Sequence, residues 1–433
     1  MKKLLLSGLL LSIASCLFAQ KNPATLLKEV ITIKEVERIE RVLASDDMRG
    51  RKIYTPEIEK AADFIAAEFK AAGLEPLKGA NGFRQEFVTV SPKQTSISAT
   101  LNGATLDPKN VLVVTSQPHV KIDQSSGYEV VSINAGANLF EVANNMASAG
   151  KNRIIMVDES FAKNFPRLAF FKRNLNKSDK NVVFILGNAE IASINIEAAH
   201  DIKEQKLANV VGVLPGKTKK DEYVIFSGHY DHIGIGKPVD GDSINNGAND
   251  DAAGITAVIL LAKFYKALGN NDRTIVFAAF TAEESGGFGS QYFSKQMDPA
   301  KVMAMFNIEM IGTESKWGKN SAYITGFEMT DMGKILETNL KGSGFTFHPD
   351  PYPDQQLFYR SDNATLAKQG VPAHTISTSK MDVEPNYHKV TDHVETLDLD
   401  NMAMIIRSIA ISARSIVAGK DTPSRVKAES LTR

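Results

Sequence analysis

The chain has 433 residues, of which 43% are hydrophobic and 23% are charged, as in an ordinary folded globular protein. Its 50 lysine and arginine residues balance 50 aspartate and glutamate residues, so the formal net charge is zero. Because it has no long basic run and no basic amphipathic helix, the sequence argues against nucleic acid or an acidic membrane surface as a partner.

The amino terminus predicts a signal peptide over residues 1–19. Lys2 and Lys3 precede an apolar run that is too short to span a membrane comfortably, and the small residue Ala19 suits cleavage. We therefore expect an exported protein, periplasmic or extracellular, without a transmembrane segment. The alternative is a lipid anchor on Cys16, because Ile13-Ala14-Ser15-Cys16 also fits a lipoprotein processing box. Cys16 is the only cysteine, which excludes an intrachain disulfide.

Residues 20–92 predict the amino-terminal part of a catalytic domain. Helical spacing of apolar residues indicates helices over Glu37–Leu43 and Pro56–Ala72, and Gly73 ends the second. Alternation over Gln85–Val90 then predicts a strand.

Residues 93–206 change in character and predict an inserted smaller β-rich domain. The strand-like pieces are VLVVT, YEVVSIN, RIIMVD and NVVFILG, and one helix is expected over Asn138–Ala149. No cluster of histidine and acidic residues lies in this segment. It is therefore not expected to hold the chemistry.

Residues 207–420 alternate between strands and helices, with a polar tail over 421–433. The pattern predicts an α/β three-layer sandwich with a mixed, mostly parallel central sheet. The expected strands are Tyr223–Phe226, Thr274–Phe280 and Val302–Ile308. The expected helices are Ala252–Leu268, Phe288–Gln296, Met329–Lys341, Ser361–Gln369 and Asn401–Val417.

Polar residues gather where the predicted strands end, which is where open α/β sheets place their sites. His229 follows the first strand, Asp250 comes after a polar loop, and the pair Glu283 and Glu284 follows the second strand. Imidazole and carboxylate together suit a divalent transition metal, and a shared carboxylate allows two neighbouring ions.

Three further residues complete the candidate set. Glu309 ends the third strand, and His388 lies in a loop behind the strand-like AHTISTS. Asp231, two residues after His229, could orient that imidazole, as carboxylates often do for metal-bound histidines.

In their order along the chain, GHYDH, GANDDAAG, TAEE, NIEMIG and YHKVTD resemble the co-catalytic di-zinc aminopeptidase family. This family includes bacterial leucyl aminopeptidases, glutamate carboxypeptidase II and, more distantly, glutaminyl cyclases. LASDDMRGR and the helix after it are similar to the amino-terminal portion of the bacterial members. Several relatives carry a protease-associated domain where residues 93–206 lie, so we expect a divergent counterpart or an unrelated elaboration there.

The resemblance implies two Zn²⁺ ions and a role for each candidate. His229 and Glu309 would hold one ion, Glu284 and His388 the other, and Asp250 would bridge them. Glu283 would be the general base that takes a proton from a water shared by the ions. The implied substrate is a peptide with a free amino terminus. The sequence departs from the family pattern at Glu309, where most members have Asp, and at Asn363, where the bacterial pattern often has His.

Several alternatives stay open at the level of sequence. Each candidate taken alone could simply cap a strand or helix, or be solvated. The same fold also serves carboxypeptidases, glutaminyl cyclases and non-catalytic receptor-like domains. His232 and His393 are expected either to support the neighbouring ligands without binding metal or to be merely exposed. Asp362 and Asp392 are weaker supporting candidates, and Tyr359 and Arg360 could line the cleft. Oligomeric state and side-chain preference are not predicted.

Overall fold

The structure is a computed structural model that describes residues 22–427. The predicted signal peptide, Ala19 and Cys16 lie outside the described residues. Within residues 22–427, no helix is both long enough and apolar enough to cross a membrane.

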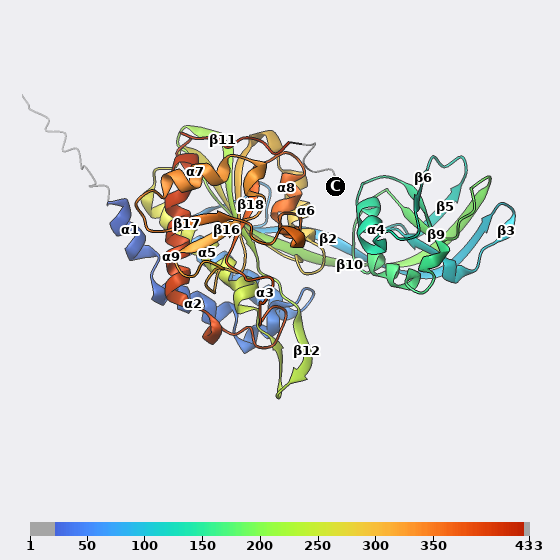
Figure 1. The fold of residues 1–433 in the computed structure, drawn as a ribbon, viewed down its shortest axis with the longest axis horizontal. Helices are drawn as coiled ribbons and strands as arrows, with labels where there is room; N and C mark the ends of the chain where they lie inside the picture. Colours follow the sequence, from blue (N-terminus) through green and yellow to red (C-terminus); the bar gives the residue numbers. More distant parts are fainter. Residues whose placement is uncertain (1–21, 428–433) are drawn as a thin grey trace, which may run out of the picture.

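A twelve-stranded mixed sheet forms the centre of the molecule (Figure 1), with the order β17-β16-β18-β15-β11-β14-β10-β2-β3 along its main path. The four strands β14, β11, β15 and β18 are parallel neighbours, whereas β10 and β16 pair antiparallel at either side of them. The bounds are β2 Arg84–Leu101, β10 Ile194–Leu214, β11 Lys219–His229, β14 Arg273–Phe280, β15 Val302–Ile308, β16 Ser321–Ile324, β17 Thr346–Pro349 and β18 Ala373–Ser377; the short strands are β1 Glu75–Pro76, β3 Ala104–Thr105, β5 His119–Asp123 and β8 Leu175–Asn176.

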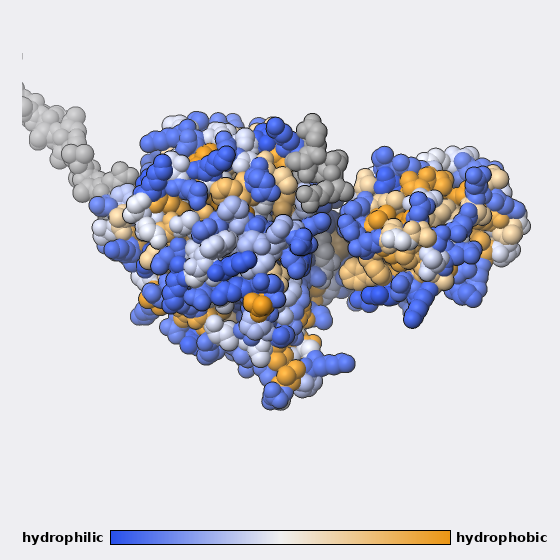
Figure 2. All heavy atoms as spheres, viewed as in Figure 1, coloured by the Kyte–Doolittle hydropathy of each residue, from blue (hydrophilic) through white to orange (hydrophobic). Residues whose placement is uncertain are grey.

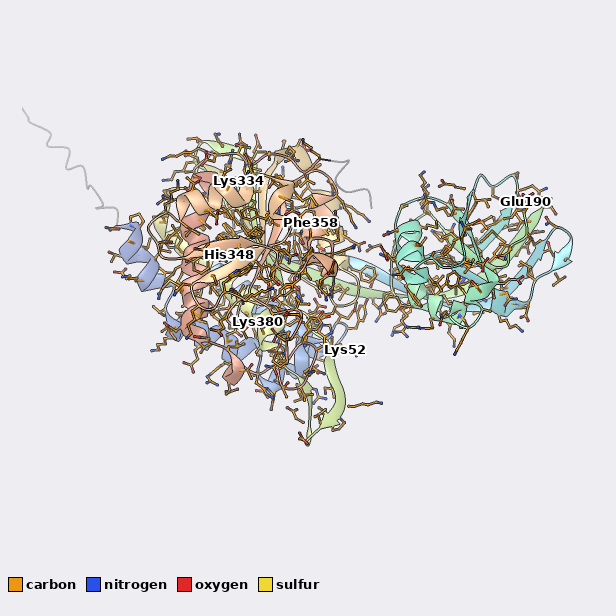
Figure 3. The ribbon with its side chains drawn as sticks, viewed as in Figure 1. Lys52, Glu190, Lys334, His348, Phe358 and Lys380 are labelled. Atoms are coloured by element: carbon orange, nitrogen blue, oxygen red, sulfur yellow. The ribbon has the colours of Figure 1, made fainter. Side chains whose placement is uncertain are left out.

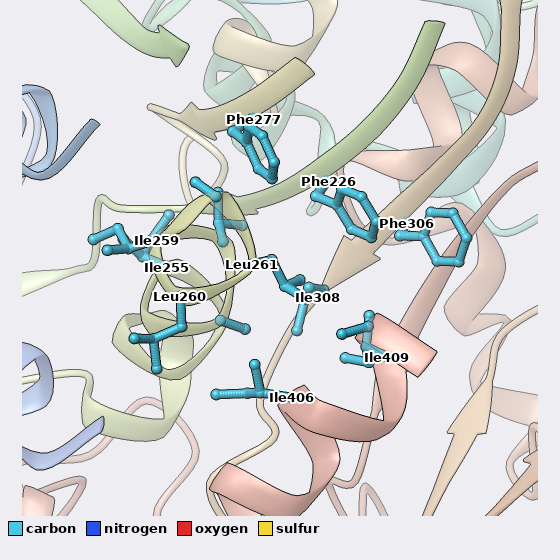
Figure 4. Close-up of a cluster of buried hydrophobic side chains, with 14 of the residues drawn as sticks. Phe226, Ile255, Ile259, Leu260, Leu261, Phe277, Phe306, Ile308, Ile406 and Ile409 are labelled. Carbon is cyan, nitrogen blue, oxygen red and sulfur yellow. The ribbon is translucent and has the colours of Figure 1, made fainter. Parts of the chain in front are cut away.

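Helices cover both faces of this sheet, which confirms the three-layer prediction. Alternation along the buried strands separates two cores: Phe226 belongs to one and its neighbour Ile225 to the other. Figure 4 shows part of the first core, where Phe226, Phe277 and Phe306 meet isoleucine and leucine side chains of α5 and α9. On the first face lie α1 Pro23–Val30, α2 Ile33–Leu43, α3 Pro56–Ala71, α5 Ala253–Leu268, α7 Met332–Asn339, α9 Leu399–Ser412 and α10 Arg414–Val417; α6 Phe288–Gln296 and α8 Asn363–Ala367 lie on the second.

The insert extends to the side of the central sheet on the long antiparallel pair of β2 and β10 (Figure 1). It contains a four-stranded sheet in the order β4-β9-β7-β6, and all four predicted strands are confirmed. Their bounds are β4 Val111–Val114, β6 Glu129–Ile133, β7 Arg153–Val157 and β9 Val182–Leu186, with helix α4 over Leu139–Ala147. The boundaries at 93 and 206 and the likeness to a protease-associated domain stay predictions.

Several elements differ from the sequence-based expectation: α2, β2 and β11 are longer than predicted, and three helices are shorter or divided. The helix expected over Met329–Lys341 begins only at Met332, because a 3₁₀ turn over Phe327–Met329 and the extended Thr330 precede it. The final predicted helix is divided at Ala413 into α9 and α10. The helix expected over Ser361–Gln369 is regular only over α8.

The expected polar loop between His229 and Asp250 contains a β-hairpin made of β12 Gly234–Val239 and β13 Asp242–Asn245. Its turn places Asp240 and Gly241 at φ values of 51° and 91°, as a two-residue Asp-Gly hairpin turn requires. The hairpin projects from the domain, and Figure 2 shows apolar surface on it, where Ile235 is 41% and Val239 is 53% exposed.

Candidate metal centre

The parallel strands bring the candidate residues to one edge of the sheet. His229 is the last residue of β11 and pairs with Phe280, the last residue of β14, so Glu283 and Glu284 follow at the same edge. Glu309 comes directly after β15, the neighbour of β11 on the other side. The predicted positions at the strand ends are therefore confirmed, and the roles of these residues stay predictions.

Sharp backbone turns aim the side chains into the site. Ala282, Met310 and His388 adopt positive φ values of 60°, 51° and 55°, which residues other than glycine rarely do. Such conformations cost about 1–3 kcal/mol each and gather at functional sites. Here each one lies at or next to a candidate site residue: Ala282 precedes Glu283, Met310 follows Glu309, and His388 is itself a candidate ligand.

Asp250 lies at the centre of the cluster, and its two carboxylate oxygens face different histidines. Its Oδ1 is 3.3 Å from His229 Nε2, and its Oδ2 is 3.2 Å from His388 Nε2. His388 Nε2 also lies 3.1 Å from Glu284 Oε2. One carboxylate thus joins two groups of potential ligands.

Two sets of three residues have ligand atoms within 4.8 Å of one another. One set is His229, Asp250 and Glu309, and the other is His232, Asp250 and Glu284. His229 Nε2 is buried and, among residues 22–427, has no hydrogen-bond partner, so it faces the cluster as a potential metal ligand. Nitrogen and carboxylate donors at these spacings fit zinc.

Buried aspartates hold the ligand loops in place. Asp251 accepts hydrogen bonds from the backbone N–H groups of His229, Gly254 and Met310 at 3.0–3.2 Å. Asp392 accepts from the N–H groups of Asn249 and Asp250, at 2.8 and 3.1 Å. The strand ends and the loop that carries Asp250 are therefore tied together through carboxylates.

Asp231 lies between His229 and Glu283. His229 Nδ1 is 3.1 Å from the backbone oxygen of Asp231 and 3.8 Å from the carboxylate Oδ1. That Oδ1 accepts a hydrogen bond from the Glu283 backbone N–H at 3.0 Å. The backbone of Asp231 is thus the nearer partner of the imidazole, and its side chain positions the loop of Glu283.

Burial and charge perturb the titration of the cluster. Burial raises the pKa of Glu309 to about 7 and that of Asp231 to about 7, although the nearby His229 opposes both shifts. For His388, burial lowers the pKa, but hydrogen bonds to Asp250 and Glu284 outweigh it and raise the value to about 10. Burial also raises the pKa of Glu283 well above its usual range. Perturbation of this kind is typical of functional sites.

The remaining candidates occupy different places. His232 lies in the cluster and is buried, so it is not merely exposed, and its side chain contacts Glu284. His393 instead pairs with Asp242 of the hairpin at 3.4 Å. Asp362 is buried beside the site, and Asn363 donates to the backbone oxygens of Phe358 and Ala373.

A small cavity of about 50 Å³ adjoins the cluster at Glu309, and apolar side chains form much of its wall. They are Met310, Tyr323, Leu357, Met381 and Tyr387; Arg360 also lines the cavity, as the sequence suggested, whereas Tyr359 is not among its residues. A larger cavity of about 820 Å³ lies at the opposite edge, where Tyr223, Thr274 and Lys301 mark the strand beginnings. It is remote from the ligands.

Comparison with known proteins supports this picture. The model of peptidase family M28 matches residues 209–412. A probable leucine aminopeptidase of Trichophyton verrucosum (strain HKI 0517) is 29% identical over 204 residues, which are 45% of this chain and 53% of that protein. The chain therefore spans about half the length of this curated relative.

Two solved structures share the fold over most of the chain. An aminopeptidase from Aneurinibacillus sp. strain AM-1 has a TM-score of 0.54 at 18% identity and covers 94% of this chain and 98% of its own. BSAP, a zinc aminopeptidase from Bacillus subtilis, has a TM-score of 0.54 at 16% identity, with 90% and 97% covered.

The described residues thus form a mixed α/β sandwich with carboxylates and histidines gathered at its strand ends. Residues 209–412, just under half of the chain, match the model of peptidase family M28. The predicted family is thereby confirmed for this part of the chain.

Proposed function

We propose that the chain is an exported aminopeptidase that binds two zinc ions. The observation that carries this proposal is the position of the Asp250 carboxylate between two histidines. Its Oδ1 faces His229, and its Oδ2 faces His388. Glu309 would complete the first site with His229, and Glu284 the second with His388. Export rests on residues 1–19 alone, and sequencing the mature amino terminus tests it against the lipid-anchored form on Cys16.

When bound, the zinc ions would polarise the scissile carbonyl and make a water molecule more acidic. Glu283 is the general base in this scheme: its carboxylate takes the proton of the attacking water and returns it to the leaving amine. The hydrogen bond from the Glu283 N–H to Asp231 holds the loop in register for that transfer. The reaction consumes one water molecule and breaks one peptide bond. It releases the first amino acid and leaves a shortened peptide with a new amino terminus.

The small cavity beside Glu309 is the candidate binding site for an apolar side chain of the substrate. Its wall offers methionine, leucine and tyrosine side chains, and burial of apolar surface favours such a residue by about 25 cal/mol per Å². We therefore expect leucine or methionine anilides to be cleaved faster than aspartate anilide. A panel of aminoacyl anilides measures this preference, and a carboxypeptidase or a cyclase would cleave none of them.

Paired substitutions of the adjacent glutamates test the assignment of roles. Glu283→Gln keeps the shape but removes the basic oxygen, so turnover should fall about 10²- to 10⁴-fold, or roughly 3 to 5 kcal/mol of barrier, with two zinc ions retained. Glu284→Gln removes a ligand charge and should deplete one ion, leaving residual activity that depends on added zinc. Zinc stoichiometry measured beside anilide turnover decides between them. If the Glu283 variant loses metal and the Glu284 variant holds two ions, the roles are reversed; a parent protein without zinc contradicts the whole scheme.

A further inference from the structure

His232 is a histidine of the cluster for which the sequence left open whether it supports a ligand or is merely exposed. Its side chain is fully buried, and its Nδ1 lies 2.8 Å from Glu284 Oε1. Its Nε2 is buried and has no hydrogen-bond partner among the described residues. Because a carboxylate oxygen only accepts hydrogen bonds, the short contact puts the imidazole proton on Nδ1.

The backbone around His232 fixes the imidazole in this orientation. The His232 N–H donates to the Arg51 carbonyl at 3.3 Å. A Cβ on Gly247, which has a φ of 62°, would lie 2.6 Å from His232 Cγ, so only glycine leaves room for the ring. These contacts hold the His232 imidazole in the orientation in which Nδ1 faces Glu284 Oε1.

The distances separate a hydrogen bond from metal ligation. Two ligand atoms about 2.0–2.1 Å from one tetrahedral zinc ion lie about 3.3 Å apart. The pairs that His388 Nε2 makes with Asp250 Oδ2 and Glu284 Oε2, at 3.2 and 3.1 Å, have this spacing. His232 Nδ1 does not, since it is 2.8 Å from Glu284 Oε1 and 3.9 Å from Asp250 Oδ2.

We infer that His232 is a positioning residue that holds Glu284 Oε1 by a hydrogen bond, so that Oε2 faces the second zinc site. This inference rests on the proposed function for the identity of the metal. Glu284 has two oxygens and a flexible stem, and without a donor on Oε1 either oxygen, or both, could turn toward the ion. Hydrogen bonds of this kind to a ligand typically change metal affinity 10- to 100-fold.

Zinc titration of the metal-free protein against a competing chelator tests the role without relying on turnover. His232→Phe removes the donor and should weaken the second site about 10- to 100-fold while the site of His229 and Glu309 keeps its affinity. His232→Asn places an amide N–H near the position of Nδ1 and should restore most of the loss. His393→Phe, a change in a histidine that pairs with the hairpin instead, is the matched control and should bind both ions as the parent does.

Cobalt substitution supplies the second measurement, because the visible spectrum of Co²⁺ reports the number of its ligands. The spectrum of the second site should be the same in the parent and in His232→Asn. Unchanged affinity in His232→Phe, with the fold verified by thermal melting, overturns the inference. A changed cobalt spectrum in His232→Asn also overturns it, because His232 would then be a ligand. If the parent binds both ions but cleaves no anilide, the proposed function fails and the role of His232 is still decided.

Discussion

Glu40 shows how strongly a single buried residue can couple stability to pH. Glu40 belongs to α2, and its side chain is fully buried. Its Oε1 accepts a hydrogen bond from the Thr256 hydroxyl at 2.7 Å, whereas its Oε2 has no partner among the described residues. Burial raises the pKa of Glu40 to about 8, against the smaller opposing effects of Thr256 and Arg51. The folded protein therefore holds a proton on this carboxyl that the unfolded chain releases near pH 4.5.

The difference between the pKa of Glu40 in the folded and in the unfolded chain predicts that the protein becomes less stable as pH rises from about 4.5 to 8. In that window the folded state binds more protons than the unfolded state, so the free energy of unfolding falls with pH, by up to about 1.4 kcal/mol per pH unit from this group. Glu40→Gln keeps the acceptor for Thr256 and should flatten the dependence and stabilise the protein at pH 8. Urea unfolding of the metal-free protein at several pH values measures it, with the partly exposed Glu37→Gln on the same helix as control. Parallel curves for parent and Glu40→Gln would contradict the prediction.

Sequence alone could place the candidate ligands because strand ends are visible as the last residue of an apolar run. His229, Glu283 and Glu309 all lie where that reasoning put them. The roles of His232, Asp251 and Asp392 could not be predicted in the same way. Apart from the Gly254 N–H, the backbone groups that donate to Asp251 and Asp392 lie 22 to 143 residues away in sequence, and such contacts depend on how the loops close. The one available signal for His232 was its closeness to His229.

At the scale of elements, the sequence was most informative where both periodicity and an end signal were present. The helix Phe288–Gln296 and the strand Val302–Ile308 have the predicted bounds, and α3 differs by one residue. The hairpin of β12 and β13 was missed because its strands are short and polar, although the dipeptide Asp240-Gly241 was a usable hairpin signal. The insert's strands were found from apolar runs, but their order in a sheet was not.

Arg51 connects the amino-terminal helices to the metal loops. The side chain is fully buried and donates to four backbone oxygens at 2.6–2.8 Å, those of Leu43, Tyr230, Asn246 and Gly247. Tyr230 follows His229, and Gly247 precedes Asp250 by three residues. One guanidinium therefore holds the loops that carry the candidate ligands His229 and Asp250 against the end of α2.

We expect replacement of Arg51 to lower both the stability of the protein and its affinity for zinc. Arg51→Lys keeps the charge, but its ammonium group has only three N–H donors on a single nitrogen. At least one of the four buried carbonyls therefore loses its hydrogen-bond partner, which costs about 1–3 kcal/mol of stability. We expect the free energy of unfolding to fall by about 2–4 kcal/mol and zinc affinity to fall with it. Chemical unfolding and zinc titration measure the two effects, and Arg49→Lys, an exposed change in the same turn, is the control. An Arg51→Lys protein with the stability of the parent would show that the four bonds are dispensable.

The whole molecule consists of two bodies with separate cores. The hydrophobic clusters of the insert contain only residues between Ile97 and Ala198, and the two clusters on the faces of the central sheet contain none of these. Beyond the strand pair of β2 and β10, the insert reaches the catalytic body through β8, where Asn176 donates to Gln291 of α6 at 2.9 Å. In Figure 3 Glu190 lies in the insert, to the side of the body that carries Lys52 and Lys380.

Separate cores and a narrow connection predict that the insert can be removed while the metal centre survives. Val90 and Glu204 face each other across β2 and β10, so an Asn-Gly turn in place of residues 91–203 closes a natural hairpin. Because the insert holds no candidate ligand and lies beside the catalytic body, we propose that it contacts the parts of a peptide beyond its first residues. Its removal should therefore change turnover of long peptides relative to short ones, while zinc stoichiometry and cleavage of a one-residue anilide stay close to the parent. Asn176→Ala, which removes only the contact with Gln291, is the control for docking of the insert. Equal loss on both substrates together with lost zinc would show that the insert is needed for folding, and an unchanged ratio would show that it does not touch the substrate.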